Sequence, residues 1–103
     1  MKSRFHERAA EDLAEEVQYY NDASPGLGLR YLAEARAATR LIERHPRLAP
    51  IVAGEIRAKH LIRFPHTLLY FVGSDEIVIL AVAHQRQDLS RWLEIVRSRR
   101  AGA

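Results

Sequence analysis

The stretch from Arg57 to His84 constrains the fold more than any other part of this 103-residue sequence. Two runs rich in β-branched and aromatic residues, Leu68–Val72 and Ile77–Ala83, are separated by a short polar link, Gly73–Glu76. Such runs, joined by a short link that contains glycine, are typical of a β-hairpin. The second run is apolar at all seven positions, which is typical of a central strand covered on both faces. The sequence therefore predicts a hairpin at the centre of a sheet.

A further strand is predicted just before the hairpin, over Arg57–Phe64. Because side chains alternate between the two faces of a strand, one face of it should be buried and the other largely cationic. The first face holds Ile56, Ala58, His60, Ile62 and Phe64, and the second holds Arg57, Lys59, Leu61 and Arg63. Pro65 should end the pairing, because proline has no backbone N–H to donate.

Two amphipathic helices are predicted ahead of the sheet. From Glu7 the apolar residues recur at intervals of three and four, which gives a helix with an acidic outer face. Its inner stripe is Ala10, Leu13, Ala14, Val17 and Tyr20, and its solvated acids are Glu11, Asp12, Glu15 and Glu16. The segment Asn21–Gly26 should break it. A second helix, from about Leu27 to Arg44, has Tyr31, Ala35, Ala38 and Ile42 as its inner stripe, and so short a break predicts an antiparallel hairpin.

The remaining segments complete a single domain over residues 1–103. Lys2–His6 is predicted to be a short edge strand and Arg47–Gly54 a connector without regular structure. A short C-terminal helix should follow Asp88 or Ser90 as its cap, with Trp92 packed against the sheet. The order β, α, α, β, β, β, α predicts a two-layer α+β fold, in which the helical hairpin packs on an antiparallel β-meander.

Composition narrows the function classes. Hydrophobic residues make up 48% and charged residues 28% of the chain, which is a globular balance. The sequence has no cysteine, so disulfides, thiol catalysis and thiolate metal sites are excluded. The five histidines show no metal-binding spacing with carboxylates, and no cofactor or metal is expected. No apolar run approaches the roughly 20 residues of a membrane span, and the N-terminus lacks the apolar core of a secretory signal, so a cytoplasmic protein without membrane contact is expected.

The charges are unevenly distributed along the chain, whose net charge is +3. Six acids against one base lie between Phe5 and Asp22, whereas five arginines against two acids follow His84. The molecule should therefore have an acidic helix and a basic end, which favours acidic partners. The candidate binding residues of the basic end are Arg86, Arg91, Arg97, Arg99 and Arg100.

Ordered motifs along nearly the whole chain resemble the RelE/ParE superfamily of toxins from bacterial type II toxin–antitoxin systems, and its ParE-like branch most closely. The strongest pieces are Arg57 with Leu61–His66, Leu69-Tyr70, Ile79–His84, and Arg86 with Trp92. They are preceded by Phe5, Ala9-Ala10, Asp12-Leu13, Tyr19-Tyr20, Leu27-Gly28, Tyr31, Glu34, Ile42, His45-Pro46 and Pro50. The resemblance implies a RelE-like fold.

It also implies a growth-inhibiting toxin that a cognate antitoxin neutralises, with an extended antitoxin segment lying over the helical hairpin and the sheet. Operator DNA would be reached only indirectly, through the antitoxin. A cationic strand face and an amphipathic helical layer would suit an acidic antitoxin. The candidate antitoxin contacts are Arg57, Lys59 and Arg63.

Three mechanisms remain open on the sequence. ParE-like members poison DNA gyrase, RelE-like members cut mRNA on the ribosome, and an inactive relative would serve only as a binding module. The nuclease groups are not present in register, because Thr67 stands where the family has an arginine and Trp92 stands in the region of its tyrosine. The strand lysines of the nuclease fall near Ala58 and His60.

Gyrase binding without chemistry of the chain's own is therefore the preferred hypothesis. Its expected target contacts are the basic C-terminal residues. If the chain were a nuclease instead, a shift of one residue in the loop would bring strand cations into play. The candidate catalytic residues would then be Arg57, Lys59, Arg63, His84 and Arg86.

Overall fold

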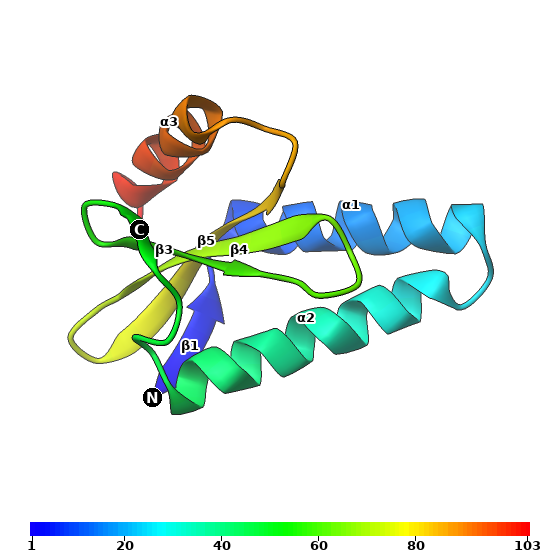
Figure 1. Cartoon of the computed structure of the whole chain (residues 1–103), viewed down its shortest axis with the longest axis horizontal. Coiled ribbons are helices and arrows are strands. Elements are labelled where there is room, and N and C mark those ends of the chain that lie inside the picture. The colour runs from blue at the N-terminus through cyan, green and yellow to red at the C-terminus, as the bar shows by residue number, and fades with distance from the viewer.

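The computed structural model describes all residues, 1–103, and contains five strands and three helices (Figure 1). The elements are β1 (Lys2–Phe5), α1 (Glu7–Ala23), α2 (Leu27–Arg44), β2 (Ile51–Ala53), β3 (Ile56–His60), β4 (His66–Val72), β5 (Glu76–His84) and α3 (Leu89–Arg100). The α+β class, the helical hairpin, the central strand pair and the C-terminal helix are all confirmed. No helix is both long and apolar enough to cross a membrane.

The sheet has the order β1-β5-β4-β3-β2. β5 lies between β1 and β4, and seven of its nine residues are buried, so the predicted central strand is confirmed. β1 pairs parallel to β5, with Phe5 opposite Ile79, and the other strand pairs are antiparallel. The sheet is thus mixed and five-stranded, whereas the sequence predicted a purely antiparallel one. β2 lies in the segment that was predicted to have no regular structure.

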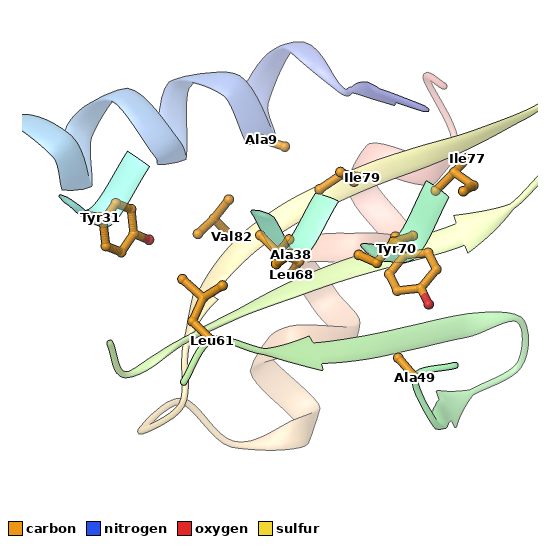
Figure 2. Packing of buried hydrophobic residues seen from close by; sticks show 11 residues of the cluster. Ala9, Tyr31, Ala38, Ala49, Leu61, Leu68, Tyr70, Ile77, Ile79 and Val82 are labelled. Carbon is orange, nitrogen blue, oxygen red and sulfur yellow. The ribbon is translucent and has the colours of Figure 1, made fainter. Parts of the chain in front are cut away.

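Two hydrophobic cores lie on opposite faces of the sheet. The larger one joins α1 and α2 to alternate sheet residues such as Leu68 and Ile79 (Figure 2). The smaller one joins the intervening residues, such as Leu69, to Trp92 and Val96 of α3. The sheet is therefore covered on both faces, and the two-layer prediction is wrong, because α3 packs opposite the helical hairpin. The expectation that Trp92 packs against the sheet is confirmed.

The antiparallel hairpin of α1 and α2 depends on Gly28. A Cβ atom at this position would lie 2.2 Å from the backbone oxygen of Val17 in α1, so only glycine lets the two helices approach this closely. The Asn21 side chain fixes the same crossing, because its Oδ1 accepts a hydrogen bond of 2.8 Å from the Gly28 N–H. The predicted inner stripe of α2 is confirmed in full, since all four of its residues are buried.

The inner face of α1 differs from the prediction. Ala9 is fully buried, whereas Ala10 and Ala14 are exposed. The helix also runs two residues beyond Asn21, to Ala23. Two of the acids assigned to solvent, Asp12 and Glu16, are instead partly buried beside β5. The buried face of α1, but not that of α2, is thus rotated about the helix axis relative to the predicted stripe, because α1 contacts β5 as well as α2.

The loop between β3 and β4 departs from the predicted strand. β3 ends at His60, and Ile62 is 88% exposed although the alternation placed it on the buried face. Glu34 of α2 causes this change, because its carboxylate accepts hydrogen bonds from the backbone N–H groups of Ile62 and Arg63 at 2.6 and 3.1 Å. These N–H groups would otherwise continue a strand ladder.

Candidate interaction surfaces

A cleft of about 540 Å³ lies along the open edge of β5, between α1 and α3. β1 ends at Phe5, opposite Ile79, so β5 has no neighbouring strand on this side from Leu80 onward. The register of β4 and β5 also shifts here, and Leu80 has no partner in β4. The cleft is lined mainly by charged and polar residues: Asp12, Glu16, His66, His84, Arg86, Gln87, Arg91 and Arg99.

Asp12 and Arg99 lie at the inner end of this cleft and form hydrogen bonds with the backbone N–H and C=O groups at the open edge of β5. The Asp12 carboxylate receives two hydrogen bonds from the Arg99 guanidinium, at 2.6 and 3.2 Å. It also accepts the Val82 N–H at 3.1 Å, while Arg99 donates to the Leu80 carbonyl at 2.8 Å. The two side chains thus replace a missing strand, and we call them the Asp12–Arg99 clamp. Such charge-assisted, bidentate bonds are among the strongest in proteins.

His66, Glu16 and His84 form the middle of the cleft. His66 is buried, and burial, reinforced by nearby His84, lowers its pKa to about 4. The ring is therefore neutral at pH 7, and its Nε2 atom lies 3.3 Å from a Glu16 carboxylate oxygen without forming an ion pair. Burial raises the pKa of Glu16, and His84 opposes that rise. The Nδ1 atom of His66 has no hydrogen-bond partner in the protein.

The outer part of the cleft is cationic and open. His84 Nδ1 accepts the Arg86 N–H at 2.9 Å, and the His84 carbonyl accepts the Trp92 indole N–H at 3.1 Å. The Arg86 side chain is exposed and makes no ion pair, and Arg91 pairs only with exposed Glu94. Asp88 caps α3 by accepting the Arg91 N–H, and this bond lowers its pKa. The predicted cap is confirmed.

A second, more apolar groove of about 990 Å³ lies between the hairpin and the loop after β3. It is lined by Tyr20, Leu27, Arg30, Ala33, Glu34, Ile62, Arg63, Phe64 and Pro65. The ring of Phe64 packs edge-on against Tyr20 and Tyr31 at 5.0 and 4.9 Å, which fixes the floor of the groove. Arg30 and Arg63 are exposed cations at its rim.

The three cations predicted for the strand before the hairpin, Arg57, Lys59 and Arg63, make different contacts in the structure. The Arg57 guanidinium donates to the carbonyls of Arg47 and Ala49, so it holds the connector before β2. The Lys59 ammonium donates to the neighbouring His60 carbonyl. Arg63 is the one of the three that lines the apolar groove, and none of them lines the cleft. The structure therefore separates these cations from His84 and Arg86.

The five C-terminal arginines also divide. Arg86, Arg91 and Arg97 are exposed, whereas Arg99 belongs to the Asp12–Arg99 clamp. Arg100 pairs with Glu55 at 2.8 Å and lies 3.4 Å above the ring of Phe71. The last two residues thus fasten α3 to the sheet, and the first three remain available to a partner.

The fold and the sequence both agree with a known family. Residues 4–89 match the family described as the ParE toxin of the type II toxin-antitoxin system parDE. The chain belongs to this ParE toxin family. Among solved structures, a chain of the "Chromosomal ParDE TA system from P. aeruginosa" matches with a TM-score of 0.73 and 20% sequence identity. That match covers 82% of this chain and 95% of the other, and it concerns the fold. No curated protein matches the sequence.

The ParE match ends at residue 89, where α3 begins. Arg86 therefore lies inside the matched region, and the arginines of α3 lie outside it. Roles for Arg91 and Arg97 are argued below from the geometry of this chain. Membership in a toxin–antitoxin family does supply one partner, an antitoxin.

Sequence reasoning missed the acidic side of the cleft in this ParE family member. Asp12 and Glu16 are four residues apart on α1, and they fit a solvated helix face by periodicity alone. The signal that could have found them is the open edge of β5, because an uncovered strand needs side chains to satisfy its N–H and C=O groups. No group of three or more potential metal ligands occurs in the structure.

Proposed function

We propose that this ParE family member inhibits growth by binding an essential protein, DNA gyrase, and that its antitoxin covers the apolar groove. One observation supports a binding mechanism most directly. Arg86 and Arg91 line the outer cleft and Arg97 is exposed on α3, whereas Arg57 and Lys59 are engaged with their own backbone. A cluster of exposed cations steers and orients a protein partner of opposite charge.

The antitoxin site follows from the chemistry of the groove. Ile62 is 88% exposed beside Phe64 and Pro65, so a partner's apolar side chain would find both shape and apolar contact there. Arg30 and Arg63 at the rim would pair with acidic residues on either side of that anchor. Extended or helical segments bind grooves in this way, with apolar anchors in pockets and charges at the rim.

Ribosome-dependent mRNA cleavage is the second candidate, and one observation favours it. His84 and Arg86 line the same cleft as Glu16, and the His84 Nε2 has no hydrogen-bond partner in the protein. Because His84 Nδ1 accepts the Arg86 N–H, the neutral ring carries its proton on Nε2. A proton donor and a cation close together are two of the groups that cleavage at a ribose 2′-hydroxyl requires. The other residues expected of the nuclease, Arg57, Lys59 and Arg63, do not line this cleft.

Growth inhibition and the antitoxin contact are tested together. Expression of the chain should stop growth, and co-expression of the antitoxin encoded beside it should restore growth. The Arg30→Glu/Arg63→Glu variant should weaken purified toxin–antitoxin binding by about 1–3 kcal/mol. The matched variant Arg57→Glu/Arg63→Glu reverses the same number of charges, but only Arg63 of that pair lines the groove. Comparing the two double variants therefore separates the contribution of the groove rim from that of a β3 cation. Harmless expression of the folded chain would contradict toxicity, and unchanged affinity in both variants would place the antitoxin elsewhere.

The target is tested with purified components. The wild-type chain should inhibit DNA supercoiling by gyrase and induce the DNA-damage response in cells. The triple variant Arg86→Glu/Arg91→Glu/Arg97→Glu should lose both effects while it still binds the antitoxin. Site-specific mRNA cuts in the ribosomal A site, abolished by Arg86→Ala or His84→Ala, would instead establish the nuclease function.

A further inference from the structure

A row of arginines runs along the solvent face of α2, away from both surfaces described above. Arg36, Arg40 and Arg44 are four residues apart, so they lie on one stripe of the helix. All three are exposed. With a rise of 1.5 Å per residue, the row is about 12 Å long. Figure 1 shows that α2 forms one side of the molecule and that its C-terminal end lies beside the N-terminus of the chain.

The charge of this row is not neutralised within the protein. None of the three side chains takes part in an ion pair. Of the two acids of α2, Glu34 accepts N–H groups of the loop after β3, whereas Glu43 accepts the Ser3 hydroxyl at 2.6 Å and lines the same hollow as Arg40 and Arg44 without forming an ion pair with them.

The N-terminus adds to the same charge. The terminal ammonium of Met1 donates to the Glu43 carbonyl at 2.9 Å, and Met1 and Lys2 line one shallow hollow with Arg40 and Arg44. The row thus continues into a patch with four cationic side chains, Arg36, Arg40, Arg44 and Lys2, against the one carboxylate of Glu43.

We propose that this arginine row binds the sugar–phosphate backbone of duplex DNA. If each of the three arginines contacts one phosphate of a strand, the row makes about three phosphate contacts. Arginine presents a planar fork of donors that suits phosphate oxygens. This contact would be direct, whereas the sequence led us to expect contact with operator DNA only through the antitoxin. It does not depend on the target of the toxin.

Other polyanions fit this face less well. Single-stranded nucleic acid is held by aromatic side chains on which bases stack, and α2 has no exposed aromatic residue. A membrane surface would require large exposed apolar residues beside the cations. The one such residue of α2 is Leu29, seven positions before Arg36, because the others are buried or partly buried. A helical face with arginines and small alanines, Ala33 and Ala37, is suited to approach a regular phosphate backbone closely.

The test is fluorescence anisotropy with a labelled 20-base-pair duplex of arbitrary sequence and the purified full chain, from 50 to 200 mM salt. Three phosphate contacts should contribute about 2.7 to the slope of log affinity against log salt. The variant Arg36→Gln/Arg40→Gln/Arg44→Gln should bind at least ten-fold more weakly at 50 mM salt, with a correspondingly smaller slope. The variant with lysine at the same three positions keeps the charge and should retain most of the affinity.

The matched control is Arg86→Gln/Arg91→Gln/Arg97→Gln, which removes the same charge from the other side of the sheet. It should bind DNA as the wild type does, and circular dichroism should show all variants folded. Equal losses in both glutamine variants would mean attraction by net charge alone, and unchanged binding in the row variant would place the DNA elsewhere. A row variant that loses the antitoxin, single-stranded RNA or anionic vesicles but keeps duplex DNA would also overturn the proposal.

Discussion

The Asp12–Arg99 clamp should contribute more to stability than any other ion pair of the protein. Replacing Asp12 by alanine removes three hydrogen bonds at once, because the Val82 N–H loses its acceptor and the Arg99 guanidinium loses both bonds to the carboxylate. The Arg99→Ala variant leaves the carboxylate and the Leu80 carbonyl without the guanidinium instead.

The magnitude follows from the partial burial of the pair. Breaking a fully buried ion pair costs about 3–5 kcal/mol, because one charge is left without a partner. The side chains here are 15% and 24% exposed, so water reaches the abandoned charge and reduces that cost. We expect about 2–4 kcal/mol for Asp12→Ala, and a somewhat smaller loss for Asp12→Asn, which keeps one acceptor oxygen. In a domain of this size each kcal/mol lowers Tm by about 4 °C or more.

A double-mutant cycle in urea measures the coupling. The free energies of unfolding of wild type, Asp12→Ala, Arg99→Ala and the double variant should give an interaction of about 1–3 kcal/mol. The control cycle uses Arg91 and Glu94, which pair at 3.1 Å on the surface with exposures of 59% and 68%. Exposed pairs of this kind couple by less than about 0.5 kcal/mol.

The reasoning fails if the clamp couples no more strongly than the Arg91–Glu94 pair. In that case the open edge of β5 would be satisfied by solvent, and Arg99 would be as free for a partner as Arg86 and Arg97. The cycle therefore also decides whether Arg99 belongs among the target contacts, as its position in the basic C-terminal segment led us to predict.

Three further predictions concern packing, pH and the cleft. Gly28→Ala should destabilise the fold by about 2–3 kcal/mol or more in thermal or urea unfolding, because the added methyl would meet the Val17 oxygen at 2.2 Å, whereas Gly102→Ala has room and should change nothing. As pH falls from about 6.5 to about 4, the free energy of unfolding should decline by up to about 3 kcal/mol, because His66 binds a proton in the unfolded chain at a higher pH than in the folded one. The His66→Gln variant, which keeps Glu16, should show a flatter profile than the wild type over this range. Trp92→Phe should cost about 1–2 kcal/mol, since the His84 carbonyl loses the indole N–H, and an equal stability would show that water replaces it.

The parts of the fold that the sequence predicted well are those with a local, repeated signal. The buried stripe of α2 follows from its helical period, and the pairing of β4 with β5 follows from two apolar runs on either side of Gly73, whose N–H donates to the Glu76 carbonyl. The cap at Asp88 is equally local. Each of these features depends on residues within about a dozen positions of one another.

The cleft could not be predicted in the same way, because its contacts are distant in sequence. Asp12 meets Val82 and Arg99, which are 70 and 87 positions away. Periodicity places Asp12 on the outside of α1, and only the position at which β1 ends, with the shift of register at Leu80, creates a need for a carboxylate there. A tertiary requirement of this kind leaves no local pattern.

The same reason explains the errors around β3. The alternation of Ile56, Ala58, His60 and Ile62 is a valid strand pattern, but its burial holds only as far as Ala58, because His60 is exposed although β3 extends to it. Beyond that point Glu34, which lies 28 residues before Ile62, offers its carboxylate to two backbone N–H groups and turns the chain away. Ile62 becomes exposed as a consequence, and the apolar groove exists because the strand stops there.

The surfaces proposed here for antitoxin, target and DNA use different residues and can be separated by mutation. The groove takes its α2 residues from the N-terminal half of the helix, up to Glu34, and the arginine row occupies the C-terminal half. Arg30 and Arg40 are ten residues apart, about 15 Å along the axis. The cleft lies beside α3, which packs on the sheet face opposite the hairpin. An antitoxin held in the groove would therefore leave the arginine row free, so a toxin–antitoxin complex could use the toxin's own charge to hold DNA while the toxin is neutralised.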